Sequence, residues 1–132
     1  MSEKHIAHLD PVYPSKEITI VAEFDADDKY LGAHNYFCYP SLGFEGGKPV
    51  YDFTADRIPI NFVKKSENGT VVAGLQSEQL LLILIDRHQK LNAVFPSEYN
   101  DQFIAGVVMA LEAMRQRVND RVGRGVMGAL KQ

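Results

Sequence analysis

Three arginines near the carboxyl end are the residues best suited to chemistry. Arg117, Arg121 and Arg124 follow one another at spacings of four and three, so on a helix their guanidinium groups project from nearly the same side. A planar guanidinium group binds phosphate oxygens through paired hydrogen bonds. The cluster therefore predicts a binding site for a phosphate or pyrophosphate. Asp120 is expected to hold a guanidinium group in place or to accept a hydrogen bond from a ribose hydroxyl. The alternative is an exposed helix end whose cations offset the helix dipole.

A second group of candidates lies between two predicted helices. Phe95 and Tyr99 flank a Pro-Ser step and have rings that can stack on a base, while Asn100 offers an amide for a base edge or ribose. A helix that begins at this step adds an amino-terminal dipole, which favours anions. The alternative is a structural junction, in which these residues cap the helix and pack against it.

Two adjacent charged residues interrupt the apolar run of the first predicted helix. Asp86 and Arg87 form an ion pair within the helix or between subunits in one interpretation. In the other, Arg87 supplies the cation of a second anion-binding pocket at a subunit junction.

Residues for bond-breaking chemistry are scarce in the sequence. His5 and His8 lie in a terminus predicted to be mobile, His34 and His88 stand alone, and Cys38 has no second cysteine. The histidines and the cysteine do not have the spacing of metal ligands, and the sequence contains no phosphate-binding glycine loop and no GxSxG motif. The sequence thus favours a binding protein without metal or cofactor over an enzyme.

Composition narrows the class further. The chain has 132 residues, of which 45% are hydrophobic and 23% charged, values ordinary for one globular domain. Its formal net charge of −3 argues against a nucleic-acid coat protein and against duplex binding. A single cysteine and an amino terminus without an apolar stretch predict a reducing, cytoplasmic setting, and the longest apolar run, Leu80–Ile85, is too short to cross a bilayer.

The half of the chain before Gly74 favours β-structure. Strands are predicted at Glu17–Glu23, Ala33–Tyr39, Val50–Thr54 and Ile58–Lys64. Gly43–Pro49 predicts a loop or hairpin turn, and Asn68-Gly69 predicts a second hairpin. Residues 1–74 are therefore expected to form a small antiparallel β-sheet layer.

The half after Gly74 favours helices. Gln79–Leu91 predicts a helix that is apolar on most sides and buried all round, with Ser77 at its start. Ser97 predicts the N-cap of a second helix, whose apolar residues recur at spacings of three and four. Residues 75–132 are thus expected to form an antiparallel two-helix hairpin, which gives one compact α+β domain overall. The apolar first helix predicts homo-oligomerisation through this hairpin.

The helical half also resembles a known family. The stretches LQSEQLLLILIDRHQKLNAVFPSEYN and ALEAMRQRVNDRVGRGVMG resemble the carboxy-terminal half of the phage Thoeris anti-defence sponge proteins. That family has an LxxExLLxxxIDR helix, an FPCxEN-like junction and an ending of the type DRxxRGVxG. The resemblance covers Leu75 to Gly128, and the DRxxRGVxG ending is its most specific part.

The resemblance implies a function without catalysis. Proteins of that family sequester cyclic ADP-ribose isomers made by the TIR-domain immune enzymes of the host, so that the signal does not reach its effector. They form higher oligomers, which makes a dimer-based hexamer the expected assembly, and some also bind cyclic di- or trinucleotides in separate pockets. The implied setting is a bacteriophage protein in the host bacterial cytosol.

The resemblance also assigns site residues. The family's ligand-contacting arginines fall on Arg117 and Arg121, and its ligand-contacting asparagine falls on Asn100. A ring-stacking aromatic residue of the family falls near Leu91, which cannot stack in the same way.

The departures from the family pattern lie at the junction. Ser97 replaces the family's cysteine, and Phe95 or Tyr99 is expected to replace the aromatic residue missing at Leu91. These departures bear on the base contact and on the preferred isomer.

Two other classes of function remain open. One is an enzyme that degrades a nucleotide signal, with His88, Asp86 or Asp120 as its base. The other is a protein-interaction module whose arginines meet an acidic partner, in a contact sensitive to salt.

Overall fold

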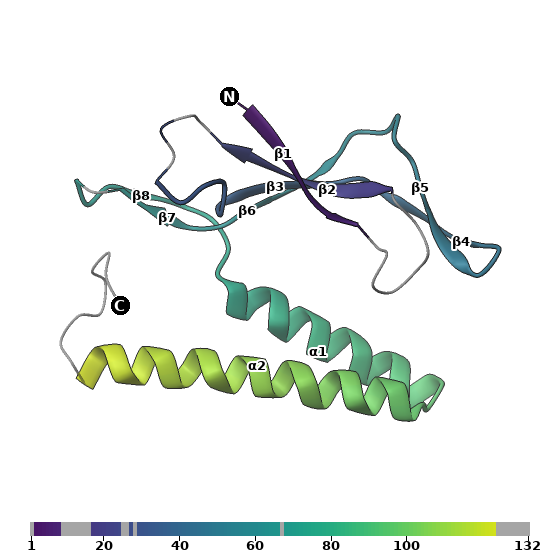
Figure 1. The fold of residues 1–132 in the computed structure, drawn as a ribbon. Coiled ribbons are helices and arrows are strands. Elements are labelled where there is room, and N and C mark those ends of the chain that lie inside the picture. The colour runs from purple at the N-terminus through teal and green to yellow at the C-terminus, as the bar shows by residue number, and fades with distance from the viewer. Residues whose placement is uncertain (1, 9–16, 25–26, 28, 67, 124–132) are drawn as a thin grey trace. The chain divides into compact units, whose positions relative to one another are not determined.

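A computed structural model of the chain describes residues 2–8, 17–24, 27, 29–66 and 68–123 (Figure 1). An antiparallel sheet region is followed by two helices, which confirms the predicted α+β class and its order along the chain. The contacts divide the chain into two compact units, residues 1–64 and 65–132. Among the described residues, neither helix is both long and apolar enough to span a membrane.

The first unit is built on a four-stranded antiparallel sheet. Its strands are β1 (Ser2–His8), β2 (Ile18–Phe24), β3 (Asn35–Cys38) and β6 (Ile58–Asn61), in the order β1-β2-β3-β6. β2 lies between β1 and β3, and its residues Thr19, Val21 and Ala22 are buried. Pro59 lies in β6, where an edge strand tolerates the missing N–H group.

Two hairpins complete the β-structure. β4 (Ser41–Glu45) pairs with β5 (Lys48–Tyr51) across Gly46-Gly47, whose positive φ angles of 61° and 82° suit a tight hairpin turn. β7 (Lys64–Lys65) pairs with β8 (Val71–Val72) around Asn68-Gly69, where the Thr70 N–H donates to Asn68 Oδ1 at 3.0 Å. The hairpin predicted at Asn68-Gly69 is therefore confirmed.

Several predicted β-elements differ from the structure. Residues 2–8 form strand β1 rather than a mobile terminus, because β2 supplies backbone partners that this segment's own pattern does not reveal. Most of Gly43–Pro49 is strand, and only Gly46-Gly47 turns. The strand predicted at Ile58–Lys64 is divided between β6 and β7.

The second unit contains the two predicted helices. They are α1 (Ser77–Val94) and α2 (Glu98–Gly123). Gln76, not Ser77, caps α1, because the Gln76 N–H group donates to the side-chain oxygen of Gln79 at 2.8 Å. Ser97 caps α2 as predicted, since its hydroxyl accepts the N–H of Tyr99 at 3.1 Å.

The two helices pack against each other through one stripe on each. Seven half-buried residues of α2 recur at spacings of four and three: Asn100, Ile104, Val107, Leu111, Met114, Val118 and Arg121. Glu112, beside this stripe, is also half-buried. On α1 the corresponding stripe is Glu78, Leu81, Ile85, His88 and Asn92. We call these facing stripes the seam, and their seven-residue repeat is typical of coiled-coil packing.

Within one chain the first helix is not buried all round. Leu82 and Ile83 lie off the seam and are 52% and 58% exposed. An apolar circumference indicates a helix with more than one neighbour, and α2 covers only one side of α1. No residue of either helix is buried in the described chain.

The cap at the start of α2 gives a direct test of the fold. We expect Ser97→Ala to destabilise the helical unit by about 1 kcal/mol, because the Tyr99 N–H loses its acceptor. Urea unfolding followed by helical circular dichroism, at fixed protein concentration, measures the change. Ser77→Ala is the matched control, because Ser77 lies inside the first turn of α1 rather than at its cap. An equal loss in both variants would contradict the assignment of the cap.

Candidate functional site

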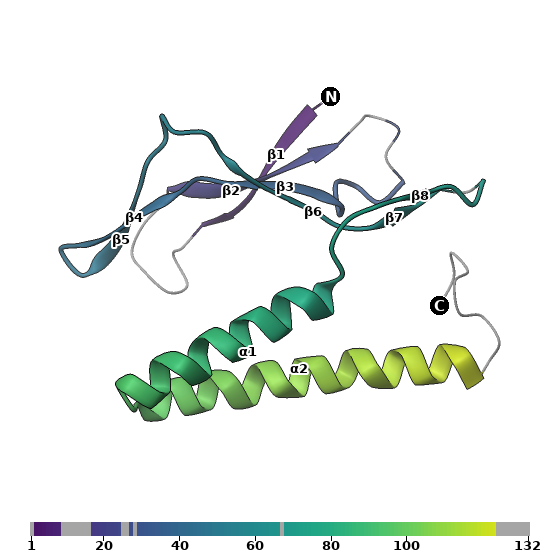
Figure 2. The same ribbon diagram turned by 180° about the vertical axis from the view of Figure 1, so that it is seen from behind.

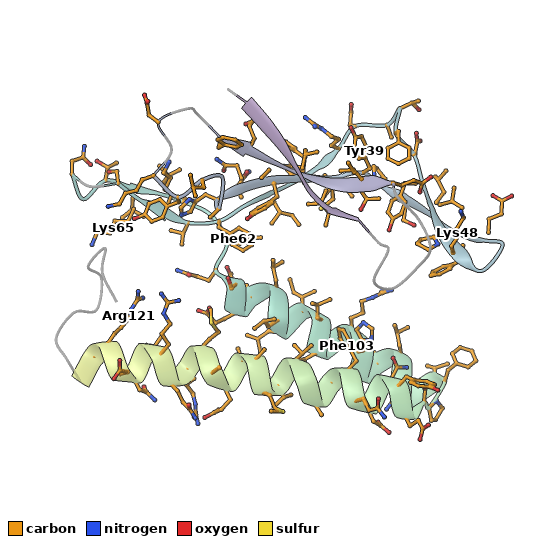
Figure 3. All side chains as sticks on the ribbon, viewed as in Figure 1. Tyr39, Lys48, Phe62, Lys65, Phe103 and Arg121 are labelled. Carbon is orange, nitrogen blue, oxygen red and sulfur yellow. The ribbon has the colours of Figure 1, made fainter. Side chains whose placement is uncertain are left out.

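The last turns of α2 carry the predicted arginine site. Arg117 and Arg121 are one turn apart on α2, so their side chains leave the helix on neighbouring positions of one face. Arg117 is exposed, whereas Arg121 is half-buried at the end of the seam (Figure 3). The Nε group of Arg121 is shielded from solvent and has no hydrogen-bond partner among the described residues. Asp120 is exposed between them, and Arg124 lies outside the described residues.

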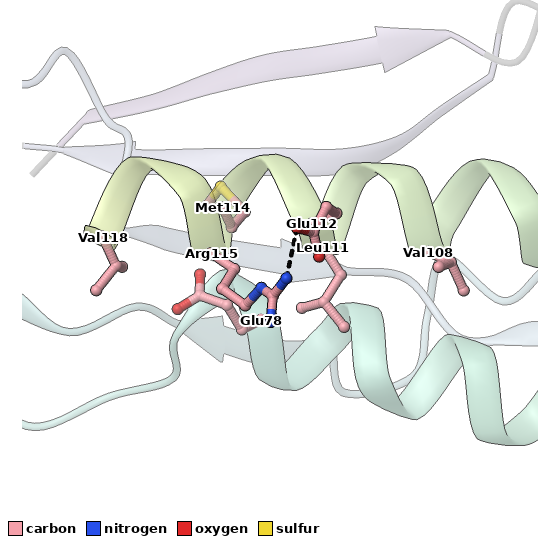
Figure 4. A pocket seen from close by; sticks show the side chains of 7 residues that line it. All are labelled: Glu78, Val108, Leu111, Glu112, Met114, Arg115 and Val118. Atoms are coloured by element: carbon pink, nitrogen blue, oxygen red, sulfur yellow. Dashed lines mark hydrogen bonds and ion pairs between the residues drawn. The ribbon is translucent and has the colours of Figure 1, made fainter. Parts of the chain in front are cut away.

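Arg115, a neighbouring arginine on the same helix, already forms an ion pair within the chain. Arg115 Nη2 lies 2.7 Å from Glu112 Oε1, and this hydrogen bond raises the pKa of the Arg115 guanidinium (Figure 4). Arg115 and Glu112, with Glu78, line the rim of a groove between α1 and α2 whose floor is apolar. Arg115 is therefore an ion-paired surface residue, separate from the Arg117 and Arg121 pair.

Asn92, which was not among the predicted site residues, holds the junction between the helices together. Asn92 Oδ1 accepts the backbone N–H of Ser97 at 2.9 Å, and Asn92 Nδ2 donates to Asp101 Oδ1 at 2.8 Å. Asn92 thus joins the end of α1 to the turn and to the first turn of α2. The sequence signal for this role of Asn92 was its place on the apolar repeat of α1, shortly before the Pro-Ser step.

The junction leaves its large apolar side chains exposed. Phe95 and Tyr99 are 77% and 75% exposed, and Leu91 is 40% exposed. Their rings and side chains are therefore accessible for stacking. The start of α2 is less suited to an anion, because Ser97 occupies the Tyr99 N–H and the first turn carries Glu98 and Asp101. Capping is thus observed at this junction.

His88 does not stand alone, in contrast to the sequence-based interpretation. Its Nδ1 atom lies 3.3 Å from Asn100 Oδ1, and its ring lies 4.1 Å from the ring of Phe103, with a tilt of 34°. The contact joins α1 to α2 across the seam. It places a predicted ligand-binding residue, Asn100, in direct contact with a titratable side chain.

The arginines and the junction residues are far apart within one chain. Both Asn100 and Arg117 lie on the continuous helix α2, whose rise of about 1.5 Å per residue separates them by about 25 Å. Phe103 and Arg121, labelled in Figure 3, lie toward opposite ends of this helix. The two predicted halves of the site therefore do not meet in a single chain.

The difference in helix length exposes the arginine end. α1 has 18 residues and α2 has 26, and the helices run antiparallel, so α2 continues past the start of α1 (Figures 1 and 2). Glu78, in the first turn of α1, lines the groove beside Met114 and Val118. Arg121 lies three residues past Val118, toward the end of α2 that extends beyond the start of α1.

The second candidate pocket has a different local environment from the one expected. Asp86 pairs with Lys90, with a distance of 2.8 Å between its Oδ2 and the lysine Nζ, rather than with Arg87. Arg87 is exposed on α1.

The remaining chemistry-bearing groups do not form a cluster in the described chain. No group of three histidine, cysteine, aspartate or glutamate side chains that can hold a metal ion is present among the described residues. Partial burial raises the pKa of the Cys38 thiol, so the thiolate is a minor species at neutral pH.

The chain matches no protein-family model and no curated protein.

Proposed function

We propose that this protein is a non-catalytic sponge that binds and sequesters cyclic ADP-ribose isomers. The observation that carries the proposal is the pair Arg117 and Arg121, which share one face at the free end of α2. The shielded Nε group of Arg121 has no hydrogen-bond partner among the described residues. A buried donor without an acceptor is costly, and a pyrophosphate supplies acceptors for both guanidinium groups.

The resemblance of the helical half to the phage Thoeris anti-defence sponge proteins supports the choice of ligand. The DRVGRGVMG segment contains both Arg121 and Arg124, and Asp120 precedes them. A cyclic ADP-ribose isomer combines a dianionic pyrophosphate with an adenine and two riboses. Arginine forks, an aromatic surface and an amide match these groups, and the biological setting is a phage protein that blocks Thoeris-type defence in the host bacterial cytosol.

The separation within α2 leads to a site shared by two copies of the chain. A ligand of this size does not span the distance of about 25 Å between Asn100 and Arg117 of one chain. If two copies pair with their α2 helices antiparallel, the arginines of one lie against the junction of the other. Each ligand then meets Arg117 and Arg121 from one subunit, and Asn100 with Phe95 or Tyr99 from the other.

The exposed apolar surface of the helices supports assembly. Leu82 and Ile83 on α1, and Met109 on α2, are 52%, 58% and 73% exposed, and large exposed apolar patches mark interaction surfaces. A homo-oligomer covers such residues, and the resemblance favours a dimer-based hexamer. Arg87 is then the candidate cation of a second pocket for a cyclic di- or trinucleotide.

A bind-and-release experiment tests the function. Purified protein is mixed with cyclic ADP-ribose isomers and cyclic oligonucleotides, desalted, and heat-denatured, and the supernatant is analysed by mass spectrometry. We expect an intact cyclic ADP-ribose isomer that appears only after denaturation. A chemically altered product would make the protein an enzyme. Retention of none of these nucleotides would contradict the sponge and favour the interaction module.

Substitution of the two arginines tests the site. We expect Arg117→Ala and Arg121→Ala each to weaken binding by about 2–5 kcal/mol, because a desolvated phosphate charge loses its partner. Titration calorimetry with the retained isomer gives the affinities. Arg115→Ala is the matched control, since this arginine on the same helix is exposed and paired with Glu112. Affinities near that of the wild type for Arg117→Ala and Arg121→Ala would remove these residues from the site.

A further inference from the structure

We propose that His88 is a positioning residue that fixes the amide of Asn100 and thereby selects the ligand group that Asn100 contacts. This inference rests on the proposed function, because it concerns the same binding site. It starts from the contact of His88 Nδ1 with Asn100 Oδ1, at 3.3 Å across the seam.

The chemistry of the two atoms determines the direction of this hydrogen bond. An amide oxygen accepts hydrogen bonds and does not donate them, so the proton must lie on His88 Nδ1. The neutral imidazole in this contact is therefore the Nδ1–H tautomer, and the protonated imidazole keeps the same donor. His88 takes one of the two lone pairs of Oδ1 and turns the Nδ2 amino group, which is a donor, away from the imidazole, so Nδ2 is the group inferred to meet a ligand.

The ring of Phe103 holds the imidazole in place. Its centroid lies 4.1 Å from that of His88, which restricts the plane of the imidazole. The hydrogen bond to Asn100 selects the ring edge that carries Nδ1. Two acidic residues near His88 have other partners: Asp86 pairs with Lys90 on α1, and Asp101 accepts from Asn92 across the junction. The adjacent Arg87 is exposed on α1.

The consequence for recognition is a polarity rule. A distance of 3.3 Å is long for an N–H···O bond, so its main consequence is orientation rather than stability. An Asn100 amide held in this way favours a ligand acceptor, such as a ring nitrogen or a hydroxyl oxygen, and disfavours a ligand group that can only donate.

Two substitutions at His88 test the positioning role. His88→Leu keeps an apolar side chain against Phe103 but removes the donor, whereas His88→Asn places an amide nitrogen near the position of Nδ1. We expect His88→Leu to lower the affinity for the retained cyclic ADP-ribose isomer about three- to tenfold, the loss typical of one hydrogen bond. We expect His88→Asn to restore most of it. Helical circular dichroism of each variant verifies that the hairpin has formed.

An isosteric change at Asn100 tests the polarity rule. Asn100→Asp keeps the shape and the acceptor for His88 but replaces the free donor with a second acceptor. We expect it to lose at least as much affinity as Asn100→Ala. If Asn100→Asp binds like the wild type, or if folded His88→Leu does, the inference is overturned.

A spectroscopic readout separates this inference from the proposed function. The ¹⁵N spectrum of the histidine ring in the wild-type protein distinguishes the Nδ1–H and Nε2–H tautomers at a pH where His88 is neutral. An Nε2–H tautomer would overturn the inference even if every variant failed to fold. A wild-type protein that retains no cyclic ADP-ribose isomer would overturn the proposed function and this inference together. Unchanged variants of a wild type that does bind would overturn only the inference.

Discussion

Asn92 makes two hydrogen bonds at the α1–α2 junction, and the arrangement of the two helices that carry the proposed site depends on this junction. One amide accepts the Ser97 N–H and donates to Asp101, so the end of α1 and the start of α2 are fixed in an antiparallel turn. That turn sets the register of the seam, brings Asn100 to His88, and leaves the longer α2 to carry its arginines past the start of α1. Polar residues at coiled-coil positions are known to specify register in this way.

The same constraint explains why the proposed binding surface is incomplete in one chain. A straight helix keeps its two ends apart, so aromatic and amide groups gather at the junction while the guanidinium groups gather at the opposite end. The exposed Phe95 and Tyr99 at one end, and the shielded Arg121 Nε at the other, each supply half of the groups that the proposed cyclic ADP-ribose ligand needs. A shared site between two subunits couples ligand binding to assembly, which suits a protein whose proposed function is to hold a ligand rather than to turn it over.

Local chemistry predicted much of this structure. Ser97 after a proline, the recurrence of apolar residues along α2, and the Asn68-Gly69 turn are signals within a few residues of the elements they specify, and each is confirmed. The start of α1 was predicted wrongly, because the reciprocal contact of Gln76 with Gln79 replaces a serine cap. Strand β1 was missed because, in the described part of the chain, it forms by pairing with β2, which lies distant in sequence.

The contacts that were missed in the candidate site are tertiary. Nothing in the sequence near His88 indicates Asn100 as a partner, since their contact depends on the antiparallel register of two helices. The role of Asn92 depends on the same register. The spacing of Arg117 and Arg121 was visible in the sequence, whereas their distance from Asn100 became evident only with the continuous length of α2.

A subunit-mixing experiment tests the central claim of a shared site most directly. Asn100→Ala and Arg117→Ala chains with different tags are co-expressed, the mixed oligomer is purified through both tags, and its binding of the retained cyclic ADP-ribose isomer is compared with that of each variant alone. If the site is shared, a mixed pair contains one site with both native residues, and ligand binding of wild-type affinity returns at a fraction of the sites. If each site lies within one chain, every site carries a defect, and the mixture binds no better than the two variants.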